Sequence, residues 1–313
     1  MNQGVYIKGL DLWLDGKISS HFSFISHGHL DHLIPHKKII STPPTYEIYK
    51  LRIKSEPGER IVLKYGESIR IKDYRITLFP SGHILGSSQI LIEGRKRLIY
   101  TGDIRLRKNL SSEPIEIKPC DILITEATYG NSRYIFPPQE EIYSMIKREI
   151  MDAKERGEIP IIFAYPLGKA QETMKLLERL GFSYSIDLAI KKYAELYQRF
   201  GIKFKSLRTI GEGWGDVLLL TYSPRFDKFL SKIKKKRTIF LTGWGMDPDS
   251  KYYYGVDSVI PLSSHADYRD LIKYIEKAEP EEIFVTHGFK EFFKDLRRLG
   301  FNAKPLKNHS IDI

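Results

Sequence analysis

Three histidines and an aspartate lie within six residues near the start of the chain, in the segment His27-Gly28-His29-Leu30-Asp31-His32. Imidazole nitrogens and carboxylate oxygens are ligands of zinc and related divalent metals. His27 and His29 are two residues apart, so both can point to one side where a strand ends. Asp31 and His32 can turn toward a neighbouring position. A polar surface turn is the simpler alternative, but this density of His and Asp beside an apolar strand favours one loop that serves two adjacent metals.

Three later segments share this layout, in which an apolar strand ends in a histidine or aspartate beside glycine. They are PSGHILGSS with His83, YTGDIR with Asp103 and VTHGF with His287. Either histidine alone would more often be structural than a ligand. Sites gather on loops beyond strand ends, where glycine lets the backbone come close. Jointly, the three segments predict a common rim with the extra ligands that a second metal needs, and Asp103 can bridge two ions.

The sequence resembles the metallo-β-lactamase superfamily, whose HxHxDH motif is matched at His27, His29, Asp31 and His32. This resemblance implies an α/β fold, a four-layer αββα sandwich with the site along one edge. It also implies two ligand sets and a bridge between them. The first metal would be held by His27, His29 and His83, the second by Asp31, His32 and His287, and Asp103 would bridge the two.

Two further motifs indicate a branch of this superfamily. Glu126 in ITEATYG, and His265 and Asp267 in PLSSHADY, look like motifs A and B of the β-CASP nucleases, with THG at His287 as motif C. The segments FAYPLGKAQE and LGSSQ are most similar to ligase-associated DNA exonucleases, and the chain also resembles archaeal mRNA 3′-end processing factor-like proteins. Ala127 departs from the pattern, because many members have serine after the motif A glutamate.

The pattern of elements changes in the middle of the chain. Short β-rich runs separated by Gly, Pro and Ser extend to about residue 130, and helices then alternate with strands, which predicts a small parallel sheet. We expect residues 1–132 and 251–313 to form the metallo-β-lactamase domain and residues 133–250 an inserted parallel α/β β-CASP domain, which in this family closes over the active site as a lid. Strands are expected at 22–26, 74–79, 89–92, 97–100, 122–125, 159–164, 217–221, 238–242, 258–262 and 283–286. Helices are expected just after Asp31 and at 45–54, 139–156, 169–180, 188–200, 268–277 and 290–299.

The catalytic candidates are Asp31, Glu126 and His265. Two bound metals would acidify a shared water and polarise the phosphoryl oxygen, but the leaving 3′ or 5′ oxygen still needs a proton. His265 lies outside the predicted ligand sets and is the candidate general acid. Glu126 could orient it, since a carboxylate bonded to one imidazole nitrogen fixes the tautomer. Alternatively, Glu126 could cap a loop and Asp267 could cap the helix that starts near Tyr268.

The substrate-binding candidates are Gly168, Lys169 and Ser264. The first two follow a strand and begin a helix, so that backbone N–H groups, the helix dipole and a lysine could hold a phosphate. Alternatively, this segment is an ordinary turn between a strand and a helix, with no role in binding. The run Tyr252-Tyr253-Tyr254 could stack on bases, or it could pack as an apolar hinge. The basic run from Lys234 to Arg237 is more often a solvated face than a binding track.

Composition limits the class of protein. The formal charge of +11 and the pI near 9.4 favour polyanionic partners. Cys120 is the single cysteine, which excludes an intramolecular disulfide and a thiolate zinc site. The N-terminal segment lacks the pattern of a signal peptide, and no stretch approaches the ~20 apolar residues of a membrane span. We expect a cytoplasmic protein whose partner is nucleic acid and not a membrane.

The predicted function is that of a nuclease with two divalent metal ions, zinc being expected and manganese the alternative. A DNA exonuclease of repair or processing is preferred, and an RNA-processing endo- or exoribonuclease is the alternative with the same chemistry. A thioesterase or lactonase would use the same motif, but Glu126, His265 and the insert count against it. A silent subunit that only binds nucleic acid is disfavoured, because every predicted ligand position is filled.

Overall fold

The computed structural model describes residues 4–54, 57–289, 291–306 and 310–312, and the chain forms two compact units. Unit 1 comprises Met1–Ile135 and His265–Ile313, and unit 2 comprises Phe136–Ser264. The sequence predicted that the insert would end at residue 250. The second unit instead extends to Ser264, because the strand at 258–260 pairs with the strand at 236–241 and becomes an edge of the second unit's sheet.

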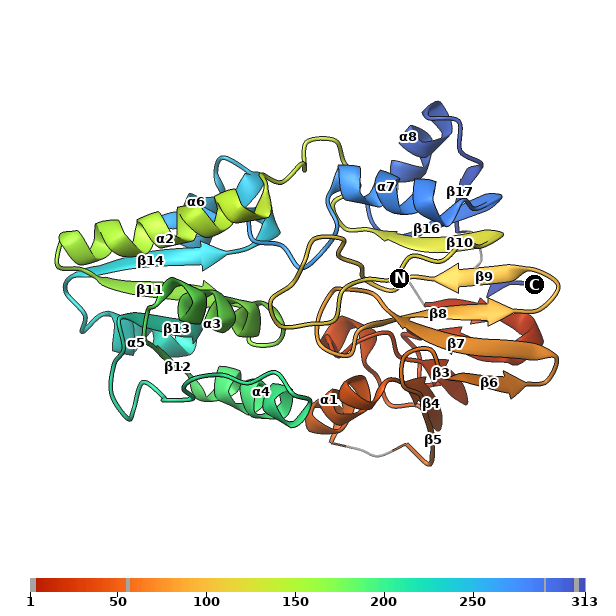
Figure 1. Cartoon of the computed structure of the whole chain (residues 1–313), viewed down its shortest axis with the longest axis horizontal. Coiled ribbons are helices and arrows are strands. Elements are labelled where there is room, and N and C mark those ends of the chain that lie inside the picture. The colour runs from red at the N-terminus through yellow and green to blue at the C-terminus, as the bar shows by residue number, and fades with distance from the viewer. Residues whose placement is uncertain (1–3, 55–56, 290, 307–309, 313) are drawn as a thin grey trace. The chain divides into compact units, whose positions relative to one another are not determined.

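Two sheets pack face to face in unit 1 (Figure 1). The first has six strands in the order β18 (Ser310–Ile311), β1 (Val5–Ile7), β2 (Leu12–Leu14), β3 (Phe22–Phe24), β4 (Lys38–Ser41) and β5 (Glu59–Val62). The second has seven, in the order β17 (Ala303–Pro305), β16 (Glu282–Gly288), β10 (Ile122–Ala127), β9 (Arg97–Tyr100), β8 (Ser88–Glu93), β7 (Tyr74–Pro80) and β6 (Ser68–Ile71). Strands β6 to β9 form an antiparallel meander, whereas β9, β10, β16 and β17 are parallel.

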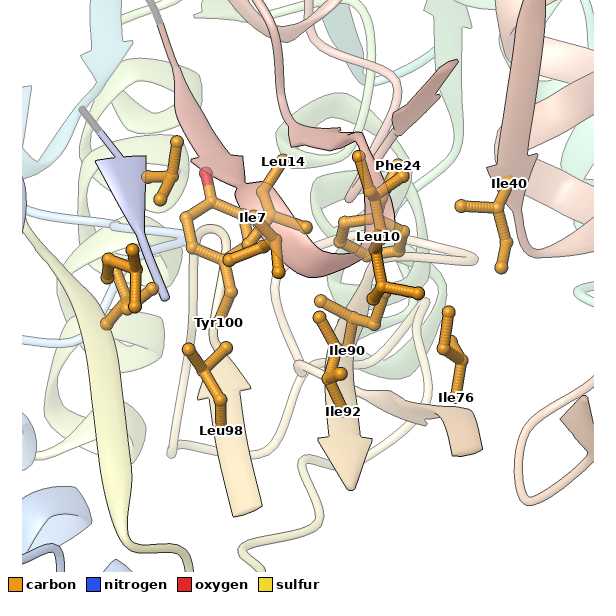
Figure 2. Packing of buried hydrophobic residues seen from close by; sticks show 14 of the residues in the cluster. Ile7, Leu10, Leu14, Phe24, Ile40, Ile76, Ile90, Ile92, Leu98 and Tyr100 are labelled. Carbon is orange, nitrogen blue, oxygen red and sulfur yellow. The ribbon is translucent and has the colours of Figure 1, made fainter. Parts of the chain in front are cut away.

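Alternating side chains on the second sheet divide its residues between two cores. Figure 2 shows Ile90, Ile92 and Leu98 pointing toward the first sheet, where they meet side chains such as Leu14 and Phe24. The intervening residues, including Leu91 and Ile99, face the opposite way and pack under α7 (Tyr268–Ala278) and α8 (Phe292–Arg298).

A helix also covers the outer face of the first sheet. Helix α1 (Pro43–Ile53) begins after Thr42, whose side chain accepts a hydrogen bond from the N–H of Thr45. Its Tyr46 and Tyr49 pack against Ile25 and Ile39. The order of layers is therefore helix, sheet, sheet, helix, which confirms the predicted αββα sandwich. The predicted final helix at 290–299 is observed as α8, and residue 290 lies outside the described residues.

Unit 2 is a five-stranded parallel sheet with helices on both faces. The strand order is β12 (Tyr184–Ile186), β13 (Val217–Thr221), β11 (Ile159–Ala164), β14 (Lys236–Leu241) and β15 (Ser258–Ile260). Helices α2 (Gln139–Glu155), α3 (Lys169–Leu180) and α4 (Leu188–Arg199) pack on the sheet, and α5 (Asp227–Leu230) and α6 (Ser250–Tyr254) contribute side chains to the core formed by Phe163, Leu220 and Phe240. From β11 the chain crosses to the edge strand β12 and returns to β13, and it then passes to β14 and on to the opposite edge strand β15. The connections that leave the neighbours β11 and β14 therefore run in opposite directions.

None of the helices in the described part of the chain combines the length and the apolar character that a membrane crossing requires.

Candidate metal centre

The loop that contains His27, His29, Asp31 and His32 follows β3, an interior strand of the first sheet. His27 is fully buried directly beyond this strand, and a 3-10 turn at Leu30–His32 then brings His32 back beside it. The ring centroids of His27 and His32 are 4.2 Å apart. The expected short helix after Asp31 is this turn, which begins one residue earlier. Its tightness allows two histidines five positions apart to face one centre.

The remaining site residues of the second sheet lie at one edge because their strands are parallel. Asp103 follows β9, Glu126 lies near the end of β10, and His287 lies near the end of β16. Glycine permits this close approach at two positions. Gly102 has φ +55 and Gly288 has φ +85, and a Cβ atom at Gly288 would lie 2.1 Å from a backbone oxygen of the neighbouring strand.

The first group of potential ligands consists of His27, His29, His83 and Asp103, whose ligand atoms all lie within 4.8 Å of one another. His29 Nδ1 lies 3.1 Å from His27 Nε2 and 3.0 Å from His83 Nε2. Asp103 Oδ2 lies 3.3 Å from His27 Nε2 and 3.7 Å from His83 Nε2. Several imidazole nitrogens and a carboxylate thus converge on one point, which is the donor arrangement of a zinc-type site.

The second group consists of Asp31, His32 and His287, and its ligand atoms also lie within 4.8 Å of one another. His32 Nε2 is 3.5 Å from Asp31 Oδ2 and 3.7 Å from Asp103 Oδ2. The same oxygen of Asp103 therefore faces both groups. The structure brings together all the residues predicted for the two metals, while their individual roles as ligands stay a prediction.

The electrostatics of this centre fit a cation. Among the described residues, His32 Nε2 and Asp103 Oδ1 are buried atoms without a hydrogen-bond partner, and such atoms are costly unless a ligand satisfies them. Burial and the neighbouring imidazoles hold the pKa of His27 well below its usual range, so its ring is neutral and can donate a lone pair. Burial disfavours the charged form of His32, but the carboxylates of Asp103 and Asp15 outweigh this effect and raise its pKa to about 9. The cluster therefore attracts positive charge, and two divalent ions would supply it.

The sequence interpretation missed Asp15. This residue is buried, adopts φ 47 and follows β2. Its Oδ2 lies 2.8 Å from His32 Nδ1 and accepts hydrogen bonds from Ser26 Oγ at 2.6 Å and Tyr100 OH at 2.8 Å, while its Oδ1 accepts from the Ser26 N–H. A carboxylate on Nδ1 fixes the ring so that Nε2 faces the centre. The signal was present in LDG, an apolar strand that ends in an aspartate beside glycine, the layout of Asp103.

Glu126 and His265 form a pair at the edge of the centre. His265 Nδ1 lies 3.1 Å from Glu126 Oε2 and 3.9 Å from Asp103 Oδ2. The carboxylate of Glu126 also accepts hydrogen bonds from the Ile104 N–H at 2.6 Å and from the hydroxyl of Thr128. Burial would raise the pKa of Glu126, but His265 and these hydrogen bonds lower it. An ionised, fixed carboxylate against a one-fifth exposed imidazole can orient that ring.

Asp267 caps a helix. Its side chain accepts a hydrogen bond from the Asp270 N–H at 2.9 Å at the start of α7, and it pairs with Arg107 at 2.5 Å. The capping alternative therefore describes what this residue does in the structure.

The three substrate-binding candidates lie in unit 2. The Gly168 N–H donates to Gln171 Oε1 at 2.7 Å, and the buried Lys169 ammonium donates to the Leu262 carbonyl at 3.0 Å. Ser264 is buried at the end of the unit. Local groups thus occupy part of the hydrogen-bonding capacity of this turn, and a phosphate contact there stays a prediction.

Comparison with known proteins places these features in a family. The profile described as a Zn-dependent metallo-hydrolase RNA specificity domain matches residues 254–309. A probable DNA ligase of Opitutus terrae is 34% identical over 96% of this chain, but the chain spans only 30% of that protein. Probable RNase MJ4 of Methanocaldococcus jannaschii is 24% identical, with 85% of this chain and 81% of that protein covered.

A solved structure shows the same fold. The crystal structure of a protein of unknown function from Enterococcus faecalis V583 superposes with a TM-score of 0.61 at 18% identity, covering 92% of this chain and 79% of that one. With the αββα sandwich, the HxHxDH loop and the relatives that match nearly the whole chain, the chain belongs to the β-CASP nuclease branch of the metallo-β-lactamase superfamily.

Proposed function

We propose that this protein is a two-metal phosphodiesterase that hydrolyses nucleic acid, and that it acts as a DNA exonuclease. The observation that carries the proposal is the position of the Glu126–His265 pair, with His265 Nδ1 3.9 Å from the Asp103 oxygen that faces both ligand groups. The thiolate released from a thioester can leave without a proton, whereas the oxygen that leaves a phosphodiester requires one. An oriented imidazole beside the ligand groups can supply that proton.

The ligand groups would hold two divalent ions, zinc in our proposal with manganese as the alternative. When bound, the ions would lower the pKa of a shared water and polarise a phosphoryl oxygen. Asp15 keeps His32 Nδ1 engaged and so directs Nε2 inward. Burial would raise the pKa of the Asp31 carboxyl, but His32 and His29 lower it, so Asp31 would stay ionised beside the second ion.

His265 would act as the general acid through Nε2, because Glu126 engages Nδ1. The negative charge of Glu126 stabilises the protonated ring before transfer and fixes which nitrogen carries the exchangeable proton. After transfer, the neutral ring can recover a proton from water, since His265 is partly exposed.

DNA is preferred as the substrate because the relative that aligns with 96% of this chain is named a probable DNA ligase. RNA is the second candidate, because the matched profile is described as an RNA specificity domain and another relative is named a probable RNase. We assign the protein to the cytoplasm, where its free and buried Cys120 would remain reduced.

The test uses single-stranded DNA and RNA labelled at either end, with Zn²⁺, Mn²⁺ or Mg²⁺ and without metal. We expect a ladder of DNA products from one end that depends on metal and is lost in His265→Ala with the metals still bound. His21→Ala is the matched control, since His21 is exposed and outside the centre. Cleavage of RNA with intact DNA would overturn the DNA preference. Hydrolysis of a thioester with neither nucleic acid cut would overturn the nuclease proposal, and unchanged cleavage by His265→Ala would overturn the acid assignment.

A further inference from the structure

Exposed aromatic side chains are confined to one unit. Every tyrosine, tryptophan or phenylalanine that is exposed in the described part of the chain belongs to unit 2, and these are Tyr165, Trp214, Tyr222, Tyr252 and Tyr253. Scattered exposed rings need no explanation, but a group of them at one place does.

Two of these rings are neighbours because of the strand register. Ala164 of β11 pairs with Thr221 of β13, so the next residues, Tyr165 and Tyr222, lie side by side beyond the carboxyl edge of the sheet. Side chains two positions apart share a face of the sheet. The two tyrosines therefore continue the row of the buried Phe163 and Leu220 past the end of the strands.

Phe240 of β14 supports the group from below. Its buried ring stacks on Tyr222 with centroids 4.9 Å apart and an angle of 24°, and it contacts Tyr254 at 4.5 Å and Tyr165 at 6.1 Å. Tyr222 OH donates a hydrogen bond to the Tyr254 carbonyl at 2.7 Å, and the Tyr253 ring packs edge-on against Tyr254 at 4.9 Å. We call Tyr165, Tyr222, Tyr253 and Tyr254 the tyrosine cluster.

The cluster is held in place yet open to solvent. Tyr165 is 52% exposed and Tyr253 is 83% exposed, although their neighbours restrict the rings. Burial, with a smaller contribution from the Tyr253 hydroxyl, raises the pKa of Tyr165. A surface of ordered, exposed rings loses little conformational entropy when a flat ligand stacks on it.

The position of the cluster is that of a ligand site in an open parallel sheet. Chain direction switches between β11 and β14, and ligands of such sheets bind outside the carboxyl ends of the strands at this switch. Tyr165 directly follows β11, and Phe240 lies near the end of β14. The cluster thus lies where the fold leaves room for a ligand.

Positive charge accompanies the rings. The Lys169 ammonium lies 5.4 Å from the centre of the Tyr165 ring, and the Lys251 ammonium lies 4.8 Å from that of Tyr252. The whole chain carries a formal charge of +11. A ligand with flat apolar rings and a chain of negative charge matches this surface. Single-stranded nucleic acid is such a ligand, because its unpaired bases expose their faces whereas a duplex hides them.

We propose that the tyrosine cluster binds single-stranded nucleic acid by stacking on unpaired bases. The proposal deepens the proposed nuclease function and rests on it for the class of ligand. It assigns the recognition of unpaired bases to unit 2, separately from the metal ligands of unit 1.

The test measures binding of the full-length protein, with its metals, to two fluorescent twelve-nucleotide strands with phosphorothioate linkages that resist hydrolysis. One strand carries thymine bases and the other is abasic with the same charge. The wild type should bind the thymine strand more tightly. Tyr165→Ala and Tyr253→Ala should weaken that binding by roughly 5- to 150-fold for each ring that stacks, without affecting the abasic strand. Tyr165→Phe and Tyr253→Phe should retain it, and a uridine strand compares RNA with DNA.

Trp214→Ala is the control for an exposed aromatic of the same unit that lies before β13 and not beyond its carboxyl end. Equal affinity of the wild type for both strands, or alanine variants that weaken binding of both strands alike, would overturn the proposal. Thermal melting confirms that each variant is folded. Hydrolysis of bis(p-nitrophenyl) phosphate, which has no nucleobase, is measured in parallel. Its absence would contradict the phosphodiesterase proposal, whereas base-dependent binding would still support the cluster.

Discussion

Asp103 of unit 1 and Asp187 of unit 2 are both almost fully buried, but their surroundings differ. Asp187 caps α4, accepts hydrogen bonds from the N–H groups of Ala189 at 2.7 Å and Thr221 at 2.5 Å, and pairs with Arg225 at 2.9 Å. Asp103 has one oxygen without a hydrogen-bond partner among the described residues, and its other oxygen faces imidazoles. Burial raises the pKa of Asp103 in spite of those imidazoles.

The difference separates a structural carboxylate from one that awaits a ligand. Protein groups supply the hydrogen bonds and the ion pair of Asp187, so this residue contributes to the stability of unit 2. Asp103 lacks such partners, so its burial should weaken the metal-free fold, and in our proposal a cation completes its contacts. The same reasoning applies to other buried groups of the two units, and the following substitutions test it.

The largest effect is expected from alanine substitution of these two aspartates. Asp103→Ala should lower kcat/KM for a phosphodiester by about 1,000-fold or more, because the residue that we propose as a ligand of both ions is lost. The melting temperature of the metal-free protein should not fall. Asp187→Ala should lower the free energy of unfolding by about 2–4 kcal/mol through loss of the cap and an unpaired Arg225, with normal activity per folded molecule. A stable but inactive Asp187→Ala, or an Asp103→Ala that keeps a tenth of the activity, would contradict the distinction.

Glu126 and Glu172 provide a second pair of buried glutamates. Glu126→Gln removes the negative partner of His265, so the pKa of His265 should fall by about one unit or more. The limb of the kcat profile in which His265 must carry a proton should move to lower pH, and kcat at neutral pH should drop by about 10- to 100-fold. Glu172 of unit 2 accepts a hydrogen bond from Tyr143, so Glu172→Gln should leave the pH profile in place. An unshifted profile in Glu126→Gln would mean that Glu126 does not control the imidazole.

Asp15 contacts a histidine of the proposed metal centre, whereas Asp11 does not. Asp15 holds His32 Nδ1, whereas Asp11 accepts a hydrogen bond from Tyr6 on the surface. Asp15→Asn should weaken metal affinity by about 10- to 100-fold, measured by competition with a chromophoric chelator. Asp11→Asn is the control and should bind metal as the wild type does. Equal affinities for all three proteins would remove Asp15 from the positioning role.

His36 tests whether a buried atom without a partner always marks a site. Its Nε2 has no hydrogen-bond partner in the described structure, and Ser20 occupies its Nδ1 at 2.8 Å. Burial lowers the pKa of His36 to about 4. Because the folded-state value lies below the unfolded value of about 6.5, unfolding takes up a proton between these pH values. The stability that His36 contributes is complete above pH 6.5 and is lost as the pH falls toward 4.

Between pH 6.5 and pH 4, the free energy of unfolding should decrease more for the wild type than for His36→Asn. We expect this extra decrease to be up to about 2 kcal/mol, because water has partial access to the ring. Urea titrations of the metal-free proteins across this range measure the difference. Asparagine is suitable because it retains an acceptor near the Nδ1 position. A constant difference between the two proteins would show that His36 does not titrate as its burial requires.

The sequence predicted the candidate metal ligands better than the residues that hold them in position. His27, His83 and His287 were recognised because each follows an apolar run beside glycine, and this local pattern survives folding. Asp15 carries a similar signal, but it stands alone, and its contacts with Ser26 and Tyr100 depend on the packing of two sheets. Contacts between residues far apart in the sequence produce no motif of fixed spacing, so they could not be predicted from the sequence.

The predicted strands and helices of the sandwich were found, but several of its strands were not expected. The short strands β1, β2 and β5 offer too few residues for a clear alternation. The end of unit 2 was misplaced because Ser258–Ile260 was assigned by position in the chain, whereas its pairing with β14 decides which sheet it joins. Exposed Tyr165 and Tyr222 were likewise unpredicted, since an aromatic directly after a buried strand is more often buried as well.

The insertion of unit 2 also sets the order in which the centre is made. His27 to Glu126 precede the insert, whereas His265 and His287 follow it, and β16 can pair with β10 only after all of unit 2 has been synthesised. Domains fold as the chain leaves the ribosome from its N-terminus. A growing chain therefore carries the loop from His27 to His32 without the imidazole of His265 until unit 2 has been synthesised. The connectivity of the chain alone delays assembly of the centre until residues beyond unit 2 have left the ribosome.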